Sequence, residues 1–116
     1  MEVEFVLKET HIAAVVTGQW TTDRAKDGIE FIAEEARKHK VTRILIDLFK
    51  LTPPKGEMTR FYTGVHMAEL WRYPLRVALI APAEKYNRFA ENVAVNRGAN
   101  IKVFTDEQEA MNWLLK

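Results

Sequence analysis

The chain has 116 residues, of which 47% are apolar and 28% charged, and its net charge at pH 7 is +1. This length predicts one domain over residues 1–116 with a single buried core, and the near-zero net charge gives no reason to expect a nucleic-acid or membrane partner. The absence of cysteine excludes disulfides, thiolate zinc sites and cysteine nucleophiles.

The first two elements are predicted to be strands joined by a tight connection. Apolar and polar residues alternate over residues 2–8, which indicates a half-buried strand, and residues 12–17 form a second, more apolar one. Glu9 and Thr10 fit the connection between them, so we expect a hairpin, and Gly18 is expected to end the second strand. The acidic, alternating start does not resemble a signal peptide, and no apolar run approaches the ~20 residues that span a bilayer. We therefore expect a cytoplasmic protein.

A first helix is predicted after Trp20. Either Thr22 or Asp23 is expected to cap it, because each side chain can accept a free N–H of the first turn. The apolar residues of this segment recur at helical spacing and form one face. They are Ala25, Ile29, Ile32 and Ala36.

The middle of the chain predicts a buried strand, a rigid loop and a second helix. Residues 43–48 are almost continuously apolar, which suits a central strand covered on both faces. Pro53 and Pro54 then prevent any regular structure from continuing. A helix is expected over residues 57–71, and its predicted buried stripe consists of Met58, Phe61, Val65 and Ala68.

The last third of the chain predicts strand, helix, strand and helix. Residues 75–81 and 101–104 are the strands, and a third helix is expected over 84–97, ending at a left-handed Gly98. Its expected inward-facing residues are Tyr86, Phe89, Ala90 and Val93. Thr105 and Gln108 have capping-box spacing before the final helix. The predicted order is ββαβαβαβα, which implies mostly parallel strand pairing.

Three segments resemble the SpoIIAA-like proteins, small bacterial domains within the STAS family of anti-sigma-factor antagonists. They are VVTGQWT at 15–21, RILIDLFKL at 43–51 and IKVFTDEQEAMNWLL at 101–115, and their order and spacing span nearly the whole chain. The resemblance implies a single-domain STAS-like (SpoIIAA-like) α/β fold, with a mostly parallel mixed sheet flanked by helices. Most SpoIIAA-like proteins have no assigned function.

The best-known chemistry of the family is a phosphorylation switch, which the resemblance places at the start of the helix after the central strand. A serine there accepts a phosphate, and the added charge abolishes binding. In this chain Gly56 and Glu57 occupy that position, and neither can be phosphorylated. Thr59 is the nearest hydroxyl and Thr52 the next, but we interpret them as a helix-surface and a loop threonine. The switch and the anti-sigma partner therefore do not carry over.

Catalytic and metal sites have little support in the sequence. The three histidines, His11, His39 and His66, lack metal-ligand spacing, and the chain has no serine or cysteine nucleophile. We expect no metal and no cofactor. Asp47 ends a predicted strand at the edge where open sheets bind ligands, although a bond to the backbone of the following loop is the competing interpretation. An enzyme using Asp47, Tyr62 and His66 is our third hypothesis.

Two further patterns have simpler explanations than a binding site. Lys55 and Gly56 precede a helix N-terminus, which favours an anion, but a single glycine is no phosphate-binding fingerprint. A turn glycine and a solubilising lysine explain them.

Basic and aromatic residues mix over residues 55–102, a composition that can bind single-stranded nucleic acid. The aromatic residues have helical spacing and are better explained as core, so we expect no nucleic-acid partner.

The helix over residues 57–71 has more apolar residues than one buried face accommodates. Outside its predicted stripe it carries Tyr62, Met67, Leu70 and Trp71. A surplus of apolar surface usually marks a protein partner, a second copy or an apolar ligand. Gly64 in mid-helix costs about 1 kcal/mol relative to alanine, and close packing there would offset this cost.

These observations lead to our first and second hypotheses. The first is a non-enzymatic binding or regulatory module for a protein partner or for a second copy of the chain in a homodimer. Its contact residues are Phe49, Lys55, Gly56, Glu57, Thr59, Tyr62, His66, Leu70 and Trp71. The second is a binder of a small apolar or lipid-like ligand, held between the loops at 49–57 and 81–86, beside Phe49, Met58 and Tyr86.

Overall fold

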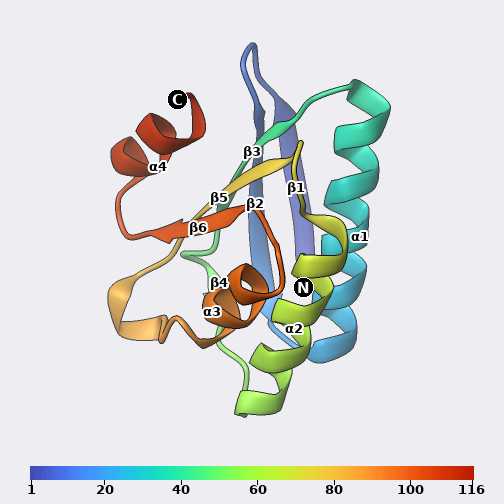
Figure 1. Ribbon diagram of the computed structural model, residues 1–116. Coiled ribbons are helices and arrows are strands. Elements are labelled where there is room, and N and C mark those ends of the chain that lie inside the picture. The colour runs from blue at the N-terminus through green and yellow to red at the C-terminus, as the bar shows by residue number, and fades with distance from the viewer.

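A six-stranded sheet and four α-helices make up the computed structural model, which describes residues 1–116 (Figure 1). The strands are β1 Glu2–Leu7, β2 Ile12–Gln19, β3 Arg43–Asp47, β4 Leu51–Thr52, β5 Arg76–Ile80 and β6 Ile101–Phe104. The helices are α1 Thr22–His39, α2 Glu57–Leu70, α3 Phe89–Asn96 and α4 Glu107–Leu114, with a 3₁₀ turn at Ala83–Lys85. The predicted α/β domain is confirmed.

The sheet is mixed and mostly parallel, as predicted. Its main order is β1-β2-β3-β5-β6, and only β1 is antiparallel to its neighbour, in the predicted hairpin. The short strand β4 was not predicted; it pairs with the end of β2, where Gly18 lies opposite Leu51. The prediction that Gly18 ends the second strand is wrong, because Gly18 adopts a φ of +94° and the strand continues past it to pair with β4.

Helices cover both faces of the sheet, with α1 and α2 side by side on one face and α4 on the other (Figure 1). In β3, Ile44 and Ile46 belong to the core under α1 and α2, whereas Leu45 packs in a second cluster with Leu114 of α4. Because successive residues of a strand point to opposite faces, a strand covered on both sides must be apolar throughout. The prediction for this strand is therefore confirmed.

Helix α1 has the predicted buried face but begins at a different cap. The side chain of Thr21, not Thr22 or Asp23, accepts a hydrogen bond from the backbone N–H of Arg24 at 3.3 Å. Three adjacent residues here can all cap a helix, so local spacing does not choose between them. The buried residues are the four predicted, Ala25, Ile29, Ile32 and Ala36.

The cap of α4 also differs from the predicted one. Asp106 is the N-cap, and its carboxylate accepts a hydrogen bond from the N–H of Glu109 at 3.1 Å. The predicted capping box of Thr105 and Gln108 is wrong, because the helix starts one residue later and Gln108 bonds to a side chain one turn on. The apolar face of α4 still packs on the sheet through residues such as Leu114.

The predicted helix over 84–97 is divided into two pieces. After the 3₁₀ turn the backbone is extended at Tyr86 and left-handed at Arg88, whose φ is +67°, and α3 begins at Phe89. Phe89 is 36% exposed, so its predicted inward position is wrong. Gly98 has the predicted left-handed conformation, with φ of +104°. The buried residues of α3 are Ala90, Glu91, Val93 and Ala94.

Glu91 is buried because two donors satisfy its carboxylate. One oxygen accepts a hydrogen bond from the hydroxyl of Tyr86, and the other accepts the backbone N–H of Val103 at 2.8 Å. Arg88 lies 3.4 Å from the same carboxylate. These contacts attach the loop after β5 to strand β6. The sequence pattern gave no indication of this buried acid.

The Tyr86–Glu91 contact predicts a loss of stability in alkaline solution. Burial first, and then the hydrogen bond to Glu91, raise the pKa of Tyr86 above its ordinary range. Because the folded chain favours the neutral phenol, this contribution is intact below about pH 10 and is lost as the pH rises further. We expect the unfolding free energy to fall more steeply above pH 10 in the natural chain than in Tyr86→Phe. Urea titrations from pH 8 to 11 measure this difference, and parallel curves for the two proteins would contradict it.

The buried face of α2 differs from the predicted stripe. The predicted residues were Met58, Phe61, Val65 and Ala68. The residues that the structure buries are Thr63, Gly64, Met67 and Ala68. Met58 is 60% exposed. Of the predicted buried residues only Ala68 is confirmed. The other three positions are wrong because α2 packs against both α1 and α3, so its buried side lies between these two helices rather than on its most apolar side.

Gly64 lies where α2 comes closest to α3. A Cβ atom at this position would lie 2.7 Å from the carbonyl oxygen of Ala90 and 2.8 Å from the Cβ of Val93. Such distances are shorter than van der Waals contact, so only glycine fits this position without a shift of α3. The predicted close packing at the mid-helix glycine is confirmed.

Candidate functional site

A row of mostly exposed residues follows the outer side of α2. Met58, Tyr62, His66 and Leu70 recur every four residues, so they lie along one side of the helix, and Tyr73 continues the row just beyond its end. We call these five residues the α2 stripe. The apolar and aromatic members are 60%, 44%, 40% and 87% exposed for Met58, Tyr62, Leu70 and Tyr73, whereas the His66 side chain is 22% exposed.

Two residues that the sequence assigned to the surplus apolar surface are instead part of the core. Trp71 is 3% exposed, and its indole N–H donates a hydrogen bond to the carbonyl oxygen of Ile29 at 3.2 Å. Met67 is 5% exposed. The inclusion of Trp71 in the contact surface is therefore wrong. Because α2 packs against both α1 and α3, a larger part of its circumference is buried than if it had one neighbour. Trp71, at its C-terminal cap, lies on this buried side.

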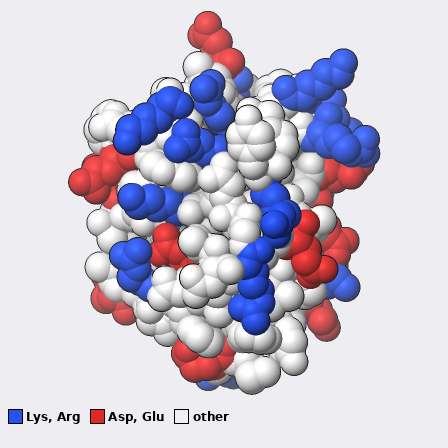
Figure 2. Space-filling view, in the orientation of Figure 1, with Lys and Arg blue, Asp and Glu red and all other residues white.

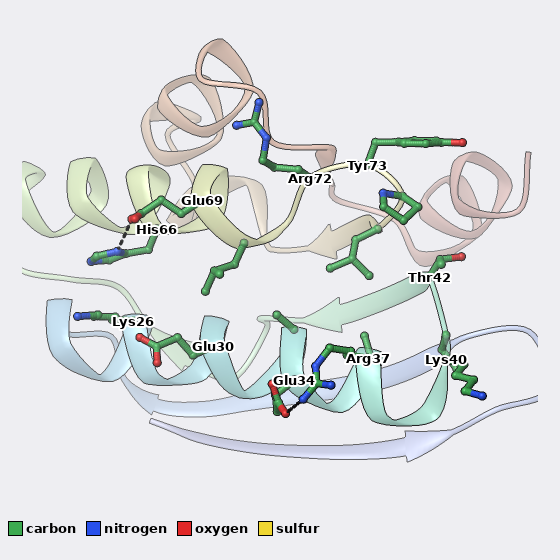
Figure 3. A pocket seen from close by; sticks show the side chains of 16 residues that line it. Lys26, Glu30, Glu34, Arg37, Lys40, Thr42, His66, Glu69, Arg72 and Tyr73 are labelled. Atoms are coloured by element: carbon green, nitrogen blue, oxygen red, sulfur yellow. Dashed lines mark hydrogen bonds and ion pairs between the residues drawn. The ribbon is translucent and has the colours of Figure 1, made fainter.

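A groove of about 980 Å³ separates the second half of α2 from α1 (Figure 3). Apolar residues such as Ala33, Leu70 and Leu75 line it. Charged residues of both helices and of the turns that follow them also line it, and they are Lys26, Glu30, Glu34, Arg37, Lys40, Glu69 and Arg72. Figure 3 shows His66 bonded to Glu69, at 3.1 Å, on the α2 side. The α2 stripe therefore forms one wall of the groove through His66 and Leu70.

The loop before α2 is held by hydrogen bonds at both ends. The carboxylate of Asp47 accepts the backbone N–H of Phe49 at 2.8 Å, which is the loop bond that the competing interpretation of Asp47 required. The side chain of Gln19 donates to the carbonyl oxygen of Pro53 at 2.9 Å. Pro54 is buried. The loop thus has a fixed position. Its exposed residues are Phe49, Lys50, Thr52, Lys55 and Gly56, and Glu57 is exposed at the start of α2.

The sequence and the fold both have known relatives. The family model described as SpoIIAA-like matches residues 11–115. The chain belongs to the SpoIIAA-like family. No curated protein matches it in sequence.

Three solved structures share this SpoIIAA-like fold. An anti-sigma factor antagonist from Mycobacterium paratuberculosis has a TM-score of 0.68 at 10% identity, over 99% of this chain and 94% of its own. An uncharacterized protein with a SpoIIAA-like fold from Shewanella loihica PV-4 has a TM-score of 0.56 at 21% identity, over 97% and 92%. SpoIIAA, an anti-sigma factor antagonist, in its unphosphorylated form has a TM-score of 0.57 at 14% identity, over 98% of both chains. At these identities the likeness shows the fold alone.

The start of α2 in this SpoIIAA-like protein lacks a phosphorylatable serine, since the whole chain contains none. Gly56 is the N-cap and supplies no side-chain bond, and Glu57 pairs with Arg60 at 3.2 Å. The nearest hydroxyl, that of Thr59, is half-buried and accepts a hydrogen bond from the hydroxyl of Thr22 at 3.1 Å. The bond ties Thr59 to α1.

The structure does not bring the residues of the enzyme hypothesis together. Asp47, Tyr62 and His66 share no hydrogen bond, and of the three only His66 lines any of the four main cavities of this SpoIIAA-like chain. No three of the His, Asp and Glu side chains are placed to hold a metal ion. None of the helices has both the length and the apolarity needed to cross a membrane.

The predicted ligand crevice is not among the main cavities of this SpoIIAA-like fold. None of them is lined by Phe49, Met58 or Tyr86. An apolar cavity does lie between the sheet and helices α1 and α2, beside Trp20 and Trp71, but its volume is about 70 Å³. For comparison, an engineered apolar cavity of roughly 150 Å³ holds benzene. The core as folded therefore has no room for a lipid-like molecule.

Proposed function

We propose that this SpoIIAA-like chain is a non-enzymatic binding or regulatory module that recognises a protein partner through the α2 stripe. The observation that carries the proposal is the alignment of exposed apolar side chains along the stripe, next to the groove. Exposed apolar surface that is contiguous and rimmed by charge is typical of interaction sites. Two of the similar structures are anti-sigma factor antagonists by name, which supports a regulatory role for the fold.

The shape of the surface supports a helical segment as the bound element. Helices α1 and α2 flank a groove with apolar lining and charged rims of both signs. An amphipathic helix binds such a groove by burying its apolar side and pairing its charges with the rims. We propose the same surface for self-association if the partner is a second copy of the chain. A cytoplasmic location remains part of this proposal.

Charge at the start of α2 is constant in this chain, in contrast to a phosphorylation switch. The acidic side chain of Glu57 is exposed there, and its pairing with Arg60 holds it at the first turn. Our proposal therefore places recognition on the middle and end of α2 and makes no use of a phosphoserine. The loop residues Phe49, Lys55 and Gly56 form the edge of the proposed surface.

Substitutions in the α2 stripe are expected to abolish partner capture without unfolding the chain. Tyr62→Glu and Leu70→Glu place a charge among apolar contacts that must lose water on binding, which costs about 2 kcal/mol or more, or at least about 30-fold in affinity. Both positions are on the surface, where substitutions change stability by about 0.5 kcal/mol. The measurement is quantitative mass spectrometry of proteins captured from the native organism, with sedimentation of the purified chain to detect self-association.

The matched control is Val95→Glu on α3. Val95 is 46% exposed, close to the exposure of Tyr62, but it lies outside the stripe and the groove. This variant should retain the partner, or the dimer, at the natural level. Equal capture by all three variants and the natural chain would disprove the proposal.

A further inference from the structure

We propose that a basic hollow at the end of the groove binds the phosphate group of a small phosphomonoester. The hollow has a volume of about 500 Å³ and lies where strands β3 and β5 begin. Its lining residues are Thr42, Arg43, Tyr73, Pro74, Arg76, Asn100 and Lys116. Three of the seven are cationic and none is acidic. Figure 2 shows Lys and Arg side chains gathered at the upper end of the molecule, where Figure 1 places the C-terminus and the start of β5.

The strand register places two of these cations side by side. Arg43 of β3 is the direct partner of Arg76 on the neighbouring parallel strand β5. Like charges that face each other across a sheet are unfavourable, and a bound anion removes this repulsion. No ion pair in the structure involves Arg43, Arg76 or Lys116. No acidic side chain therefore neutralises the three cationic side chains of the hollow.

The guanidinium of Arg76 is fixed in place but has few partners. It lies over the indole ring of Trp113, 4.4 Å from the ring centroid. Its Nη1 donates to the main-chain oxygen of Lys116 at 3.4 Å, and its Nε is buried without a partner. A planar guanidinium held by stacking presents its remaining donors in a fixed orientation, which suits the oxygens of a phosphate.

Neutral groups of the hollow complete the donor set. Thr42 and Tyr73 contribute hydroxyls, and the amide of Asn100 is held by its bond to the carbonyl oxygen of Leu75 at 2.8 Å. Thr42, Tyr73 and Pro74 also line the groove between α1 and α2, and Figure 3 shows Thr42 and Tyr73 at one end of it. A ligand that places its phosphate in the hollow can therefore extend its organic part into the end of the groove that is formed by these three shared residues.

The test is a titration followed by ¹H–¹⁵N NMR at constant ionic strength, with inorganic phosphate and then phenyl phosphate as probes. We expect saturable shifts of the amides of Thr42 and Asn100 and of the Nε–H of Arg76. Phenyl phosphate should bind more tightly than inorganic phosphate if the groove holds the organic part. Equal affinities would limit the site to a free oxyanion and overturn the phosphomonoester assignment.

Charge-matched variants decide whether the hollow is the site. Arg43→Gln and Arg76→Gln should each weaken phosphate binding about tenfold, whereas Lys102→Gln, which removes one exposed charge from the same sheet outside the hollow, should leave it unchanged. If Arg76→Gln fails to fold because it loses its contact with Trp113, Arg43→Gln alone carries the test. Equal weakening by Lys102→Gln, or shifts that do not saturate, would overturn the proposal.

A lengthened chain tests the contribution of the last residue. Adding Gly-Ser after Lys116 keeps the main-chain oxygen that contacts Arg76 and moves any terminal charge away from it. Phosphate should bind this chain at least as tightly as the original. Loss of binding on lengthening would contradict a site formed by the side chains of Arg43 and Arg76.

Discussion

Gly64→Ala is expected to destabilise the chain by about 2 kcal/mol, although alanine is the better helix former. Overpacking by one methyl group costs about 1–3 kcal/mol, and helix propensity returns up to about 1 kcal/mol. The new Cβ would contact the carbonyl oxygen of Ala90 and the Cβ of Val93. Neither atom can rotate away as the end of a side chain can, so we expect a cost near the upper end of the range. Urea unfolding with a shared m-value measures the difference.

Gly28→Ala is the matched control, because Gly28 also lies inside a helix. A Cβ there would meet only side-chain atoms of Val3 and Met1, at 3.6 and 3.8 Å, which are ordinary contacts. Because alanine causes no clash here, only its higher helix propensity acts, and we expect the free energy of unfolding to increase by about 0.5–1 kcal/mol. If both variants gain stability, the close approach of α2 and α3 at Gly64 is not a constraint on the fold.

Trp71→Ala is expected to cost about 3–5 kcal/mol, the range for truncating a buried aromatic side chain. Trp71 is 3% exposed and bonded to the carbonyl oxygen of Ile29. Tyr62→Ala, on the exposed side of α2, should cost about 0.5 kcal/mol, because Tyr62 is 44% exposed and its ring packs edge-to-face against that of Phe61. Urea unfolding followed by circular dichroism gives both values.

A milder variant keeps this prediction testable if Trp71→Ala does not fold. Trp71→Phe retains most of the ring but loses the indole hydrogen bond and part of the packing, so an intermediate loss is expected. Equal losses for the Trp71 and Tyr62 variants would contradict the assignment of the first to the core and the second to the surface. If Tyr62→Ala leaves the stability of the fold nearly unchanged, the effects of substitutions in the α2 stripe on partner capture can be interpreted as effects on binding rather than on folding.

The family resemblance could be predicted from the sequence because packing patterns and their spacing carry it. The segments at 15–21 and 43–51 contain the ends of two strands, and the segment at 101–115 contains the last strand and helix. The family model matches residues 11–115, which include all three segments. The absence of the family's serine was likewise visible in the sequence. The identity of the contact residues was only partly predictable, since Tyr62 and Leu70 are exposed and Trp71 is not.

The sequence by itself determined the features that depend on one element and its own periodicity. The face of α1 with Ile29 and Ile32, the apolar run of β3 and the left-handed Gly98 are of this kind. Each follows from the repeat of a helix, the alternation of a strand or the conformational freedom of glycine, which neighbouring residues alone specify.

Only the tertiary structure decided which surfaces are covered and which charges meet. Which residues of α2 are buried depends on the packing of α3 against Gly64. The burial of Glu91 depends on hydrogen-bond donors from the loop after β5 and from β6. The pairing of Arg43 with Arg76 depends on a register between strands 33 residues apart in sequence. Periodicity reports the side of an element on which a residue lies, whereas burial and electrostatic potential depend on what packs against that side.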